Sequence, residues 1–219
     1  MARIAVFGGH GKVALHLERL LSDAGHEVSA VIRNPDHADD VRAAGGTPVV
    51  ADVEQLDALA FNELLQGHDA VVWSAGAGGG SALRTYAVDR DAAIASMTAA
   101  QQAGVRRYVM ISYYGSRPDH GVPEDNSFYA YAEAKAAADT HLRAAELDWT
   151  ILGPSKLTLD PPTGRIDIAG HGATEPGEVS RADVAAVAAA VLERPETAGL
   201  TIEFNNGDTP IGEALDALR

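Results

Sequence analysis

The residues whose types and spacing could do chemistry lie in the middle of the chain, at Ser112, Tyr131 and Lys135. Tyr131 and Lys135 are four residues apart in an alanine-rich segment that predicts a helix, so both face the same side. A tyrosine with a pKa of about 10 is a poor acid or base at neutral pH, but a nearby ammonium group favours the phenolate. We therefore interpret Tyr131 as a proton donor or acceptor. Ser112 ends the preceding predicted strand, where its hydroxyl could donate a hydrogen bond to a substrate carbonyl.

These side chains together could support hydride transfer to or from a carbonyl carbon, and Lys135 could also bond the ribose of a nicotinamide nucleotide. Taken alone, Tyr and Lys at this spacing occur by chance on many helices. The functional interpretation therefore depends on whether the chain also has a site for such a nucleotide.

A nucleotide-binding turn is predicted near the N-terminus, where the apolar segment 4–7 ends in glycines and a helical pattern follows. Gly8 lets the chain turn off the strand end, Gly11 lets backbone N–H groups approach an anion, and Ala14 lets the helix pack closely. The positive end of the helix dipole makes a pyrophosphate the natural ligand. The alternative is a glycine turn that serves packing alone. The cofactor-binding residues predicted here are Gly8, Gly9, His10, Gly11, Lys12 and Val13.

The residue after the second predicted strand indicates which nucleotide would bind. In NAD sites this position usually holds an acid that bonds the ribose 2′-hydroxyl, whereas here it is Arg33, and the next acid is Asp36. An arginine can pair with a 2′-phosphate through two hydrogen bonds, so we expect NADP(H), with NAD(H) as a possible second cofactor. An ordinary surface arginine is the alternative. Asp52 and Val53 follow the third predicted strand and would border the adenine, although Asp52 could instead cap the next helix.

Strands and helices alternate along the chain, and this alternation predicts how the candidate residues are brought together. Buried strands are expected at residues 4–7, 27–32, 47–51, 69–73, 108–111, 149–152 and 200–204. The pattern is typical of an α/β fold, a doubly wound parallel sheet of about seven strands with helices on both faces. Ligands bind at the carboxyl ends of such strands. The residues predicted to bind the cofactor at further strand ends are Ser74, Ala75, Gly76 and Pro154.

The chain, residues 1–219, is predicted to form a single domain. Its longer helices are expected at residues 13–23, 86–103, 128–146 and 181–192, and the first has Leu15, Leu17, Leu20 and Leu21 on its inner side. The segment 153–180 is expected to be irregular, with one short strand at 165–169. It would form a small, variable region on the substrate side.

Composition argues against several kinds of partner. The net charge of −14 is spread along the chain, which argues against nucleic acid and anionic membranes. No apolar run is long enough to span a bilayer, and Arg3 enters the first strand with no signal peptide before it. The chain has no cysteine, and its eight histidines lack ligand spacing, so no metal site is expected. We expect a cytoplasmic monomer or homodimer with a small-molecule substrate.

Several motifs together resemble those of one family. They are Gly8-Gly9-His10-Gly11-Lys12-Val13-Ala14, Val88-Asp89, residues 103–112, Tyr131 with Ala134-Lys135, residues 147–154 and residues 180–185. With these motifs the chain resembles an atypical short-chain dehydrogenase/reductase of the NAD(P)H-binding, epimerase-like subgroup, which has a single Rossmann domain. The resemblance covers nearly the whole chain. It implies a Rossmann fold, a nucleotide site that often prefers NADP, and catalytic roles for Ser112, Tyr131 and Lys135.

Two departures from the family pattern bear on activity. Asp89 occupies the position of the superfamily's active-site asparagine, as it often does in the subgroup, and is the fourth candidate catalytic residue. The usual Arg-Pro after the sixth strand is Gly153-Pro154, so any contact made by that arginine is absent. Two functions therefore stay open. The first is an NADP(H)-dependent oxidoreductase or epimerase-like enzyme acting on a small carbonyl, quinone or flavin-type substrate, which the retained Ser112, Tyr131 and Lys135 favour. The second is a non-catalytic NADP(H)-binding sensor or regulatory protein.

Overall fold

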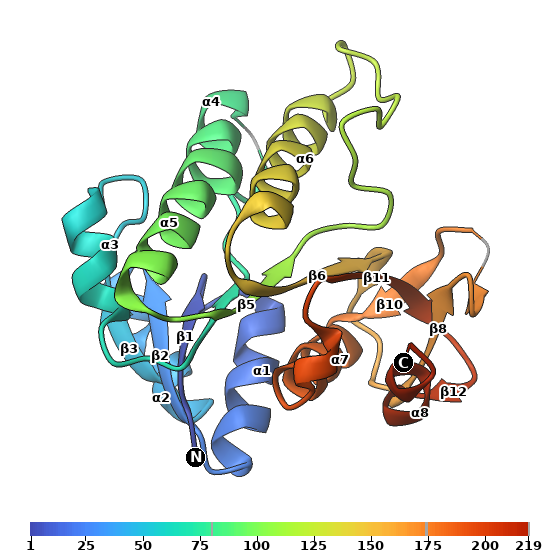
Figure 1. The fold of residues 1–219 in the computed structure, drawn as a ribbon, viewed down its shortest axis with the longest axis horizontal. Helices are drawn as coiled ribbons and strands as arrows, with labels where there is room; N and C mark the ends of the chain where they lie inside the picture. Colours follow the sequence, from blue (N-terminus) through green and yellow to red (C-terminus); the bar gives the residue numbers. More distant parts are fainter. Residues whose placement is uncertain (80, 174, 219) are drawn as a thin grey trace.

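A parallel sheet forms the centre of the molecule, as the alternating sequence pattern predicted (Figure 1). The computed structural model describes residues 1–79, 81–173 and 175–218. The parallel strands are β1 (Arg3–Phe7), β2 (Glu27–Ile32), β3 (Thr47–Val50), β4 (Ala70–Trp73), β5 (Arg107–Ile111), β6 (Asp148–Pro154) and β11 (Leu200–Asn206). They are hydrogen-bonded in the order β11-β6-β5-β4-β1-β2-β3.

Short strands extend the sheet beyond β11. β8 (Arg165–Ala169) runs antiparallel to β11, β12 (Thr209–Pro210) runs antiparallel to β8, and β9 (Gly172–Ala173) pairs with β8. β7 (Lys156–Thr158) and β10 (Glu178–Ser180) form a separate two-stranded sheet. The main sheet thus has ten strands within the described residues, more than the number predicted. The predicted strand at 165–169 is confirmed, but the rest of 153–180 is less irregular than expected.

Helices cover both faces of the sheet (Figure 1). One face carries α1 (Lys12–Asp23), α2 (Ala38–Ala43), α7 (Arg181–Leu192) and α8 (Ile211–Asp216), and the other carries α3 (Ala58–Leu65), α5 (Ala93–Ala103) and α6 (Tyr129–Ala144). α4 (Ala82–Thr85) and the π-helical segment η2 (Tyr86–Ala92) lead into α5. Single 3₁₀ turns occur at η1 (Pro35–His37) and η3 (Pro195–Thr197). The helix predicted at 86–103 therefore starts earlier and contains a π-helical segment.

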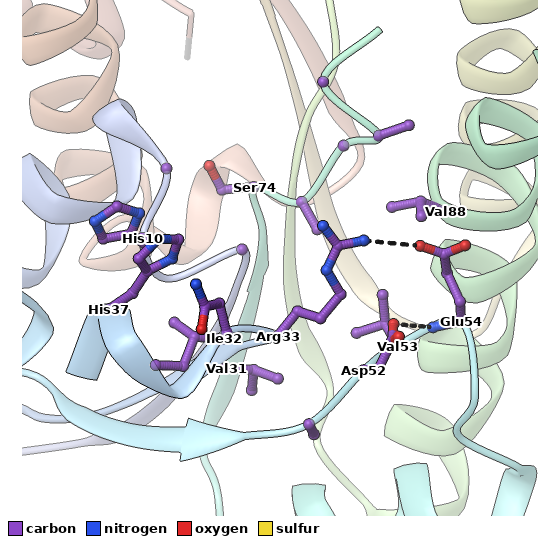
Figure 2. A pocket seen from close by; sticks show the side chains of 18 of the residues that line it. His10, Val31, Ile32, Arg33, His37, Asp52, Val53, Glu54, Ser74 and Val88 are labelled. Carbon is purple, nitrogen blue, oxygen red and sulfur yellow. Dashed lines mark hydrogen bonds and ion pairs between the residues drawn. The ribbon is translucent and has the colours of Figure 1, made fainter. Parts of the chain in front are cut away.

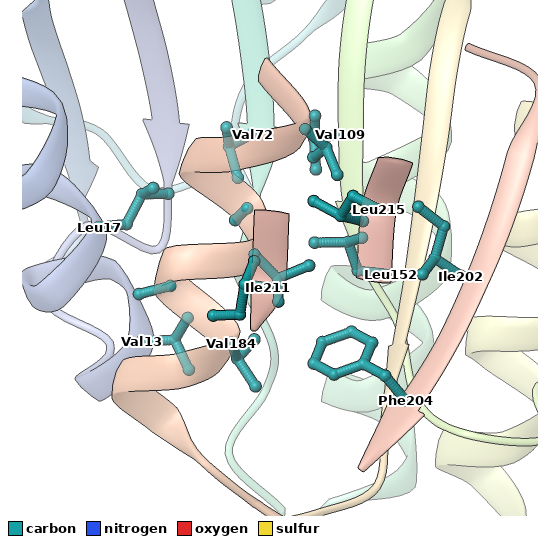
Figure 3. Packing of buried hydrophobic residues seen from close by; sticks show 14 of the residues in the cluster. Val13, Leu17, Val72, Val109, Leu152, Val184, Ile202, Phe204, Ile211 and Leu215 are labelled. Carbon is teal, nitrogen blue, oxygen red and sulfur yellow. The ribbon is translucent and has the colours of Figure 1, made fainter. Parts of the chain in front are cut away.

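Alternate residues of β1 point into the two layers of the core. Ile4 and Val6 join the layer beneath α1 and α7. Phe7 joins the opposite layer, where its ring lies 5.9 Å from that of Phe61 and 5.0 Å from that of Trp73. The first layer also contains Val13, Leu17, Val184, Phe204 and Leu215 (Figure 3). Burial on both faces makes β1 a rigid support for the loop that follows it.

The strand order reverses beside β1, because β2 and β3 lie on one side of it and β4, β5 and β6 on the other. Doubly wound sheets bind ligands in the crevice at such a reversal, outside the carboxyl ends of the strands. The predicted site residues are therefore sought at the ends of β1, β2 and β4. None of the described helices combines the length and apolar character that a bilayer crossing requires.

Candidate functional site

The glycine turn between β1 and α1 fits tightly against its neighbouring strands. Gly8 has a φ of +79°, and a Cβ atom there would lie 2.6 Å from the Cα atom of Ala75. A Cβ atom at Gly9 would lie 2.7 Å from the Cβ atom of Ala30. The N–H groups of Gly8 and Gly9 donate to the carbonyl of Val31, at 3.1 and 2.9 Å. These two glycines therefore shape the turn through close packing, and their N–H groups are already used.

The N-terminus of α1 supplies N–H groups that an anion could accept. Gly11 precedes the helix in an extended conformation, and its own N–H donates to the carbonyl of Gly8 at 2.7 Å. In the part of the chain that the structure describes, no side chain caps this end and no acid lies in the first turn. The N–H groups of Lys12 and Val13 have no acceptor inside the helix and carry its partial positive charge. This end of α1 fits a phosphate group.

A cavity of about 470 Å³, the cofactor cavity, opens beside this turn (Figure 2). Among the predicted cofactor-binding residues it is lined by Gly8, His10, Gly11, Arg33, Asp52, Val53, Ser74, Ala75 and Gly76. The predicted residues outside its lining are Gly9, Lys12, Val13 and Pro154. Apolar side chains of Val31, Ile32 and Val53 border it close to the guanidinium of Arg33. An apolar wall, a guanidinium and a helix N-terminus together fit the adenosine and phosphate groups of a dinucleotide.

Arg33 and Arg84 meet at one carboxylate. Arg33 Nη1 lies 3.4 Å from Glu54 Oε1, and Arg84 Nε lies 2.8 Å from the same oxygen (Figure 2 draws the first pair). The Glu54 side chain is only 17% exposed, whereas that of Arg33 is 56% exposed. Glu54 thus holds Arg33 at the mouth of the cavity while much of the guanidinium stays open to a ligand. The sequence analysis did not predict Glu54 or Arg84 as site residues. Glu54 could have been found because it lies two residues after the predicted Asp52, but no motif marked Arg84.

Two stacked histidines form another part of the lining. The rings of His10 and His37 lie 3.6 Å apart, and His10 Nε2 is 2.8 Å from Asp40 Oδ2 (Figure 2 shows the stacked rings). Asn34 lies beside them and accepts the N–H of Asp36 at 3.1 Å. His10 was predicted from the glycine turn, whereas His37 and Asn34 were missed. All of these groups come from the loops after β1 and β2.

Asp52 organises the loop after β3. Its Oδ1 accepts the N–H of Glu54 at 3.1 Å. The following helix, α3, is capped instead by Asp57, whose carboxylate accepts the N–H of Ala60 at 2.9 Å. The alternative that Asp52 caps the next helix is therefore wrong. Asp52 lines the cofactor cavity and turns the backbone so that Glu54 reaches the two arginines.

A second cavity, of about 710 Å³, shares residues 76–78 with the cofactor cavity, and we call it the substrate-side cavity. Asp89 and Tyr131 both line it. Asp89 Oδ2 accepts the N–H of Ala77 at 2.9 Å, and a Cβ atom at Gly76 would lie 3.0 Å from Oδ1. Burial raises the pKa of Asp89, and the nearby charge of Lys135 opposes that rise. Asp89 therefore holds the segment that both cavities share.

Tyr131 lines the substrate-side cavity, but Lys135, one helical turn further along α6, is fully buried. Lys135 Nζ donates to the carbonyl of Ile111 at 2.9 Å, and burial lowers the pKa of this amine. Burial raises the pKa of Tyr131 well above its usual value, and the carboxylates of Asp89 and Asp139 add to the rise. The expectation that Lys135 draws Tyr131 toward the phenolate stays a prediction, because the Lys135 ammonium bonds the Ile111 carbonyl in this structure.

Ser112 and Pro154 lie behind the two cavities. The Ser112 hydroxyl donates to Asp139 Oδ2 at 2.5 Å, and Ser116 donates to the same oxygen at 2.6 Å. Ser112 is 4% exposed, and neither cavity has it in its lining. Pro154 is the last residue of β6, and its carbonyl accepts the N–H of Tyr114 at 2.9 Å. Ser112 still lies in the neighbourhood of Tyr131, because Asp139, which accepts its hydroxyl, is one of the carboxylates that raise the pKa of Tyr131. Pro154 lines neither cavity.

Comparisons with known proteins agree with this arrangement. A family model described as NAD(P)H-binding matches residues 8–195. A Bacillus subtilis protein described as an uncharacterized sugar epimerase is 32% identical over 222 residues, which cover 99% of this chain and 100% of that protein.

Solved structures are similar over the same length. One from Bacillus halodurans, named as a candidate NAD-dependent epimerase/dehydratase, is 33% identical with a TM-score of 0.90 and covers 99% of this chain and 100% of its own. An oxidoreductase from Lactococcus lactis is 29% identical with a TM-score of 0.87, and the match covers 99% of this chain and 96% of that one. The whole chain, including the segment 153–180, therefore has counterparts in these proteins.

Proposed function

Since this chain belongs to the NAD(P)H-binding family, we propose that it is an NADP(H)-dependent oxidoreductase of the epimerase-like type. It transfers hydride to or from a small carbonyl, quinone or flavin-type substrate. One observation carries the proposal: residues 76–78 form a wall shared by a cavity lined with arginines and a cavity lined by Tyr131. A bound nicotinamide nucleotide would supply the hydride chemistry at this wall.

The lining of the cofactor cavity supports a preference for NADP(H). Arg33 stands where NAD sites usually hold an acid, and Glu54 restrains its guanidinium beside the apolar wall. Arg84 lines the same cavity and shares the Glu54 carboxylate. A ribose 2′-phosphate could take charge-assisted hydrogen bonds from Arg33, which are stronger than the hydrogen bond that a 2′-hydroxyl could form there.

Tyr131 is the proposed proton donor. Burial raises the pKa of Tyr131, so its hydroxyl is protonated at neutral pH and can give a proton to a substrate oxygen. In the reverse direction the same oxygen would take the proton back. Asp89 holds the N–H of Ala77 and so fixes the wall opposite this hydroxyl. Lys135 does not line the cavity; its ammonium group donates to the Ile111 carbonyl, and the charges of Asp139 and Asp89 favour its protonated form.

A second candidate is an NADP(H)-binding sensor that performs no turnover. It is favoured by the engagement of two expected catalytic groups, since Asp139 accepts the Ser112 hydroxyl and the Ile111 carbonyl accepts the Lys135 ammonium. For a sensor, NADPH would change the association state or partner binding while no hydride acceptor is found. For the reductase, acceptor-dependent oxidation of NADPH would be seen.

Replacement of the proposed proton donor tests this function. Tyr131→Phe should lower kcat for NADPH-dependent acceptor reduction by about 100-fold or more, because only the proton donor is removed. The Kd for NADPH should stay within about twofold, since Tyr131 lies outside the cofactor cavity. Tyr113→Phe is the matched control, because its ring lies 5.5 Å from that of Tyr131 but does not line the substrate-side cavity. An equal loss of kcat in both variants, or an unchanged kcat in Tyr131→Phe, would refute the role of Tyr131 as proton donor.

A further inference from the structure

The substrate-side cavity differs from the cofactor cavity in charge. Among the described residues that line it there is no Lys, Arg or His, and Asp89 and Glu124 bring carboxyl groups to it. The cofactor cavity also has two carboxylates, Asp52 and Glu54, but it has Arg33, Arg84 and two histidines beside them. Because no cation of the lining can pair with a phosphate or carboxylate, an anionic substrate would lose its hydration without compensation.

The walls of this cavity are rich in aromatic rings. Tyr86, Phe128, Tyr129 and Tyr131 all line it. The Phe128 ring lies 5.2 Å from the Tyr131 ring at an interplanar angle of 49°, and Phe128 is still 41% exposed. An exposed ring that is held by other rings offers a surface on which a flat substrate can stack.

We infer that the substrate-side cavity takes a flat, uncharged aromatic carbonyl compound and rejects acceptors that carry a phosphate or carboxylate. This inference rests on the proposed function, because it names the substrate class of the same site. Its basis is the aromatic lining, the two carboxyl groups and the lack of basic lining residues in the described part of the cavity.

Three cations near the cavity do not change this pattern. Arg84 Nη1 donates to the carbonyl of Ala77 at 3.3 Å, but its Nε pairs with Glu54 at 2.8 Å and it lines the cofactor cavity instead. The Arg90 guanidinium lies 4.8 Å from the centre of the Tyr86 ring, but it is paired with Asp91 at 2.7 and 3.1 Å and does not line the cavity. Lys135 is buried and bonded to the Ile111 carbonyl. None of these three cations lines the substrate-side cavity, where it could pair with a phosphate on a bound acceptor.

The reaction balances for a quinone-type acceptor. The acceptor gains a hydride from NADPH and a proton, the latter from the Tyr131 hydroxyl, and becomes the hydroquinone. NADPH is oxidised to NADP⁺, and Tyr131 recovers its proton from water. No further oxidant or reductant is needed.

Riboflavin and flavin mononucleotide form a matched pair of probes, because they share the ring and side chain and differ only in a phosphate. Binding of each to the whole protein is measured by flavin fluorescence with saturating NADP⁺ present, which fills the cofactor cavity, and NADPH oxidation is followed separately. Riboflavin should bind at least about tenfold more tightly than flavin mononucleotide. Glu124→Gln should narrow this ratio by about two- to fivefold, because it removes one partly solvated negative charge. Glu63→Gln, exposed on α3 and outside both cavities, is the matched control and should leave the ratio unchanged.

Equal or tighter binding of flavin mononucleotide would overturn the inference, as would displacement of riboflavin by UDP-glucose, which carries a diphosphate. An unchanged ratio in Glu124→Gln would also overturn it. Selective riboflavin binding supports it whether or not NADPH is consumed. Selective riboflavin binding with no oxidation of NADPH would instead contradict the proposed reductase function. Failure of the substrate-class inference can therefore be told apart from failure of the reductase function.

Discussion

Glu18 is a fully buried carboxyl group on α1, and neither of its side-chain oxygens has a hydrogen-bond partner among the described residues. It packs against the backbone turn at Gly46, where a Cβ atom would lie 3.0 Å from its Oε2. Burial raises the pKa of Glu18 from 4.5 to about 8. Glu18 therefore stays protonated in the folded chain at neutral pH, whereas in the unfolded chain it is ionised.

This difference predicts a dependence of stability on pH. The unfolded carboxyl loses its proton near pH 4.5 and the folded one near pH 8, so Glu18 destabilises the fold progressively as pH rises between these values. The slope for one uncompensated proton is about 1.4 kcal/mol per pH unit. The free energy of unfolding of Glu18→Gln, measured by denaturant titration, should therefore increase relative to that of the natural chain as the pH rises from 5 to about 8. Glu63 is exposed, so Glu63→Gln should leave the difference in free energy of unfolding from the natural chain constant with pH. A constant difference for Glu18→Gln as well would contradict the raised pKa of Glu18.

Individual site residues were predictable where fold position determines their role. Arg33 follows a strand that ends at the crevice, and Tyr131 lies on the helix after the fifth parallel strand. Glu54 and Arg84 were not predictable, because they meet through loops whose approach depends on the folded backbone. Ser112 occupies the expected strand end, but a long-range bond to Asp139 takes its hydroxyl.

Among the elements, the seven parallel strands lie close to the runs that predicted them. The signal is clearest for β1, β4 and β5, whose residues are mostly apolar and buried. Short strands such as β7, β9 and β10 have too few residues for a periodic signal. On α1 the pattern placed Leu20 inside, yet Leu20 is 40% exposed while Glu18 is buried. Apolar periodicity cannot show such an exchange, because the small turn at Gly46 makes room for Glu18.

The junction of β1, β4 and α1 depends on the absence of a side chain at Gly8. Gly8→Ala would place a Cβ atom 2.6 Å from the backbone of Ala75 in a residue with φ of +79°. We expect a loss of about 2 kcal/mol or more in unfolding free energy, from backbone strain and the clash together, with weaker NADPH binding. Gly25→Ala is the matched control, since its φ is +84° but nothing described lies within 4 Å of its Cβ position. If both variants lose equal stability and NADPH affinity, the close fit at Gly8 has no special role.

At the scale of the whole molecule, the reversal of strand order opens a crevice whose two halves differ in chemistry. The segments after β1 and β2 supply the cofactor cavity with Arg33 and two histidines, and α4 supplies Arg84. The helical segments η2 and α6 supply the substrate-side cavity with Asp89 and aromatic rings. Residues 76–78, after β4, join the two halves, so a nucleotide in one cavity would present its reactive end to a substrate in the other.

A paired fluorescence titration with NADPH and NADH at one ionic strength shows whether the cofactor cavity selects NADP(H). NADPH should bind at least about tenfold more tightly than NADH, and Arg33→Ala should remove most of this difference. Arg19→Ala, an exposed arginine on α1 outside the cavity lining, should leave the difference unchanged. Comparable Kd values for the two nucleotides would contradict the role of Arg33. Binding of neither nucleotide would contradict the assignment of the cofactor cavity and the hydride-transfer function that depends on it.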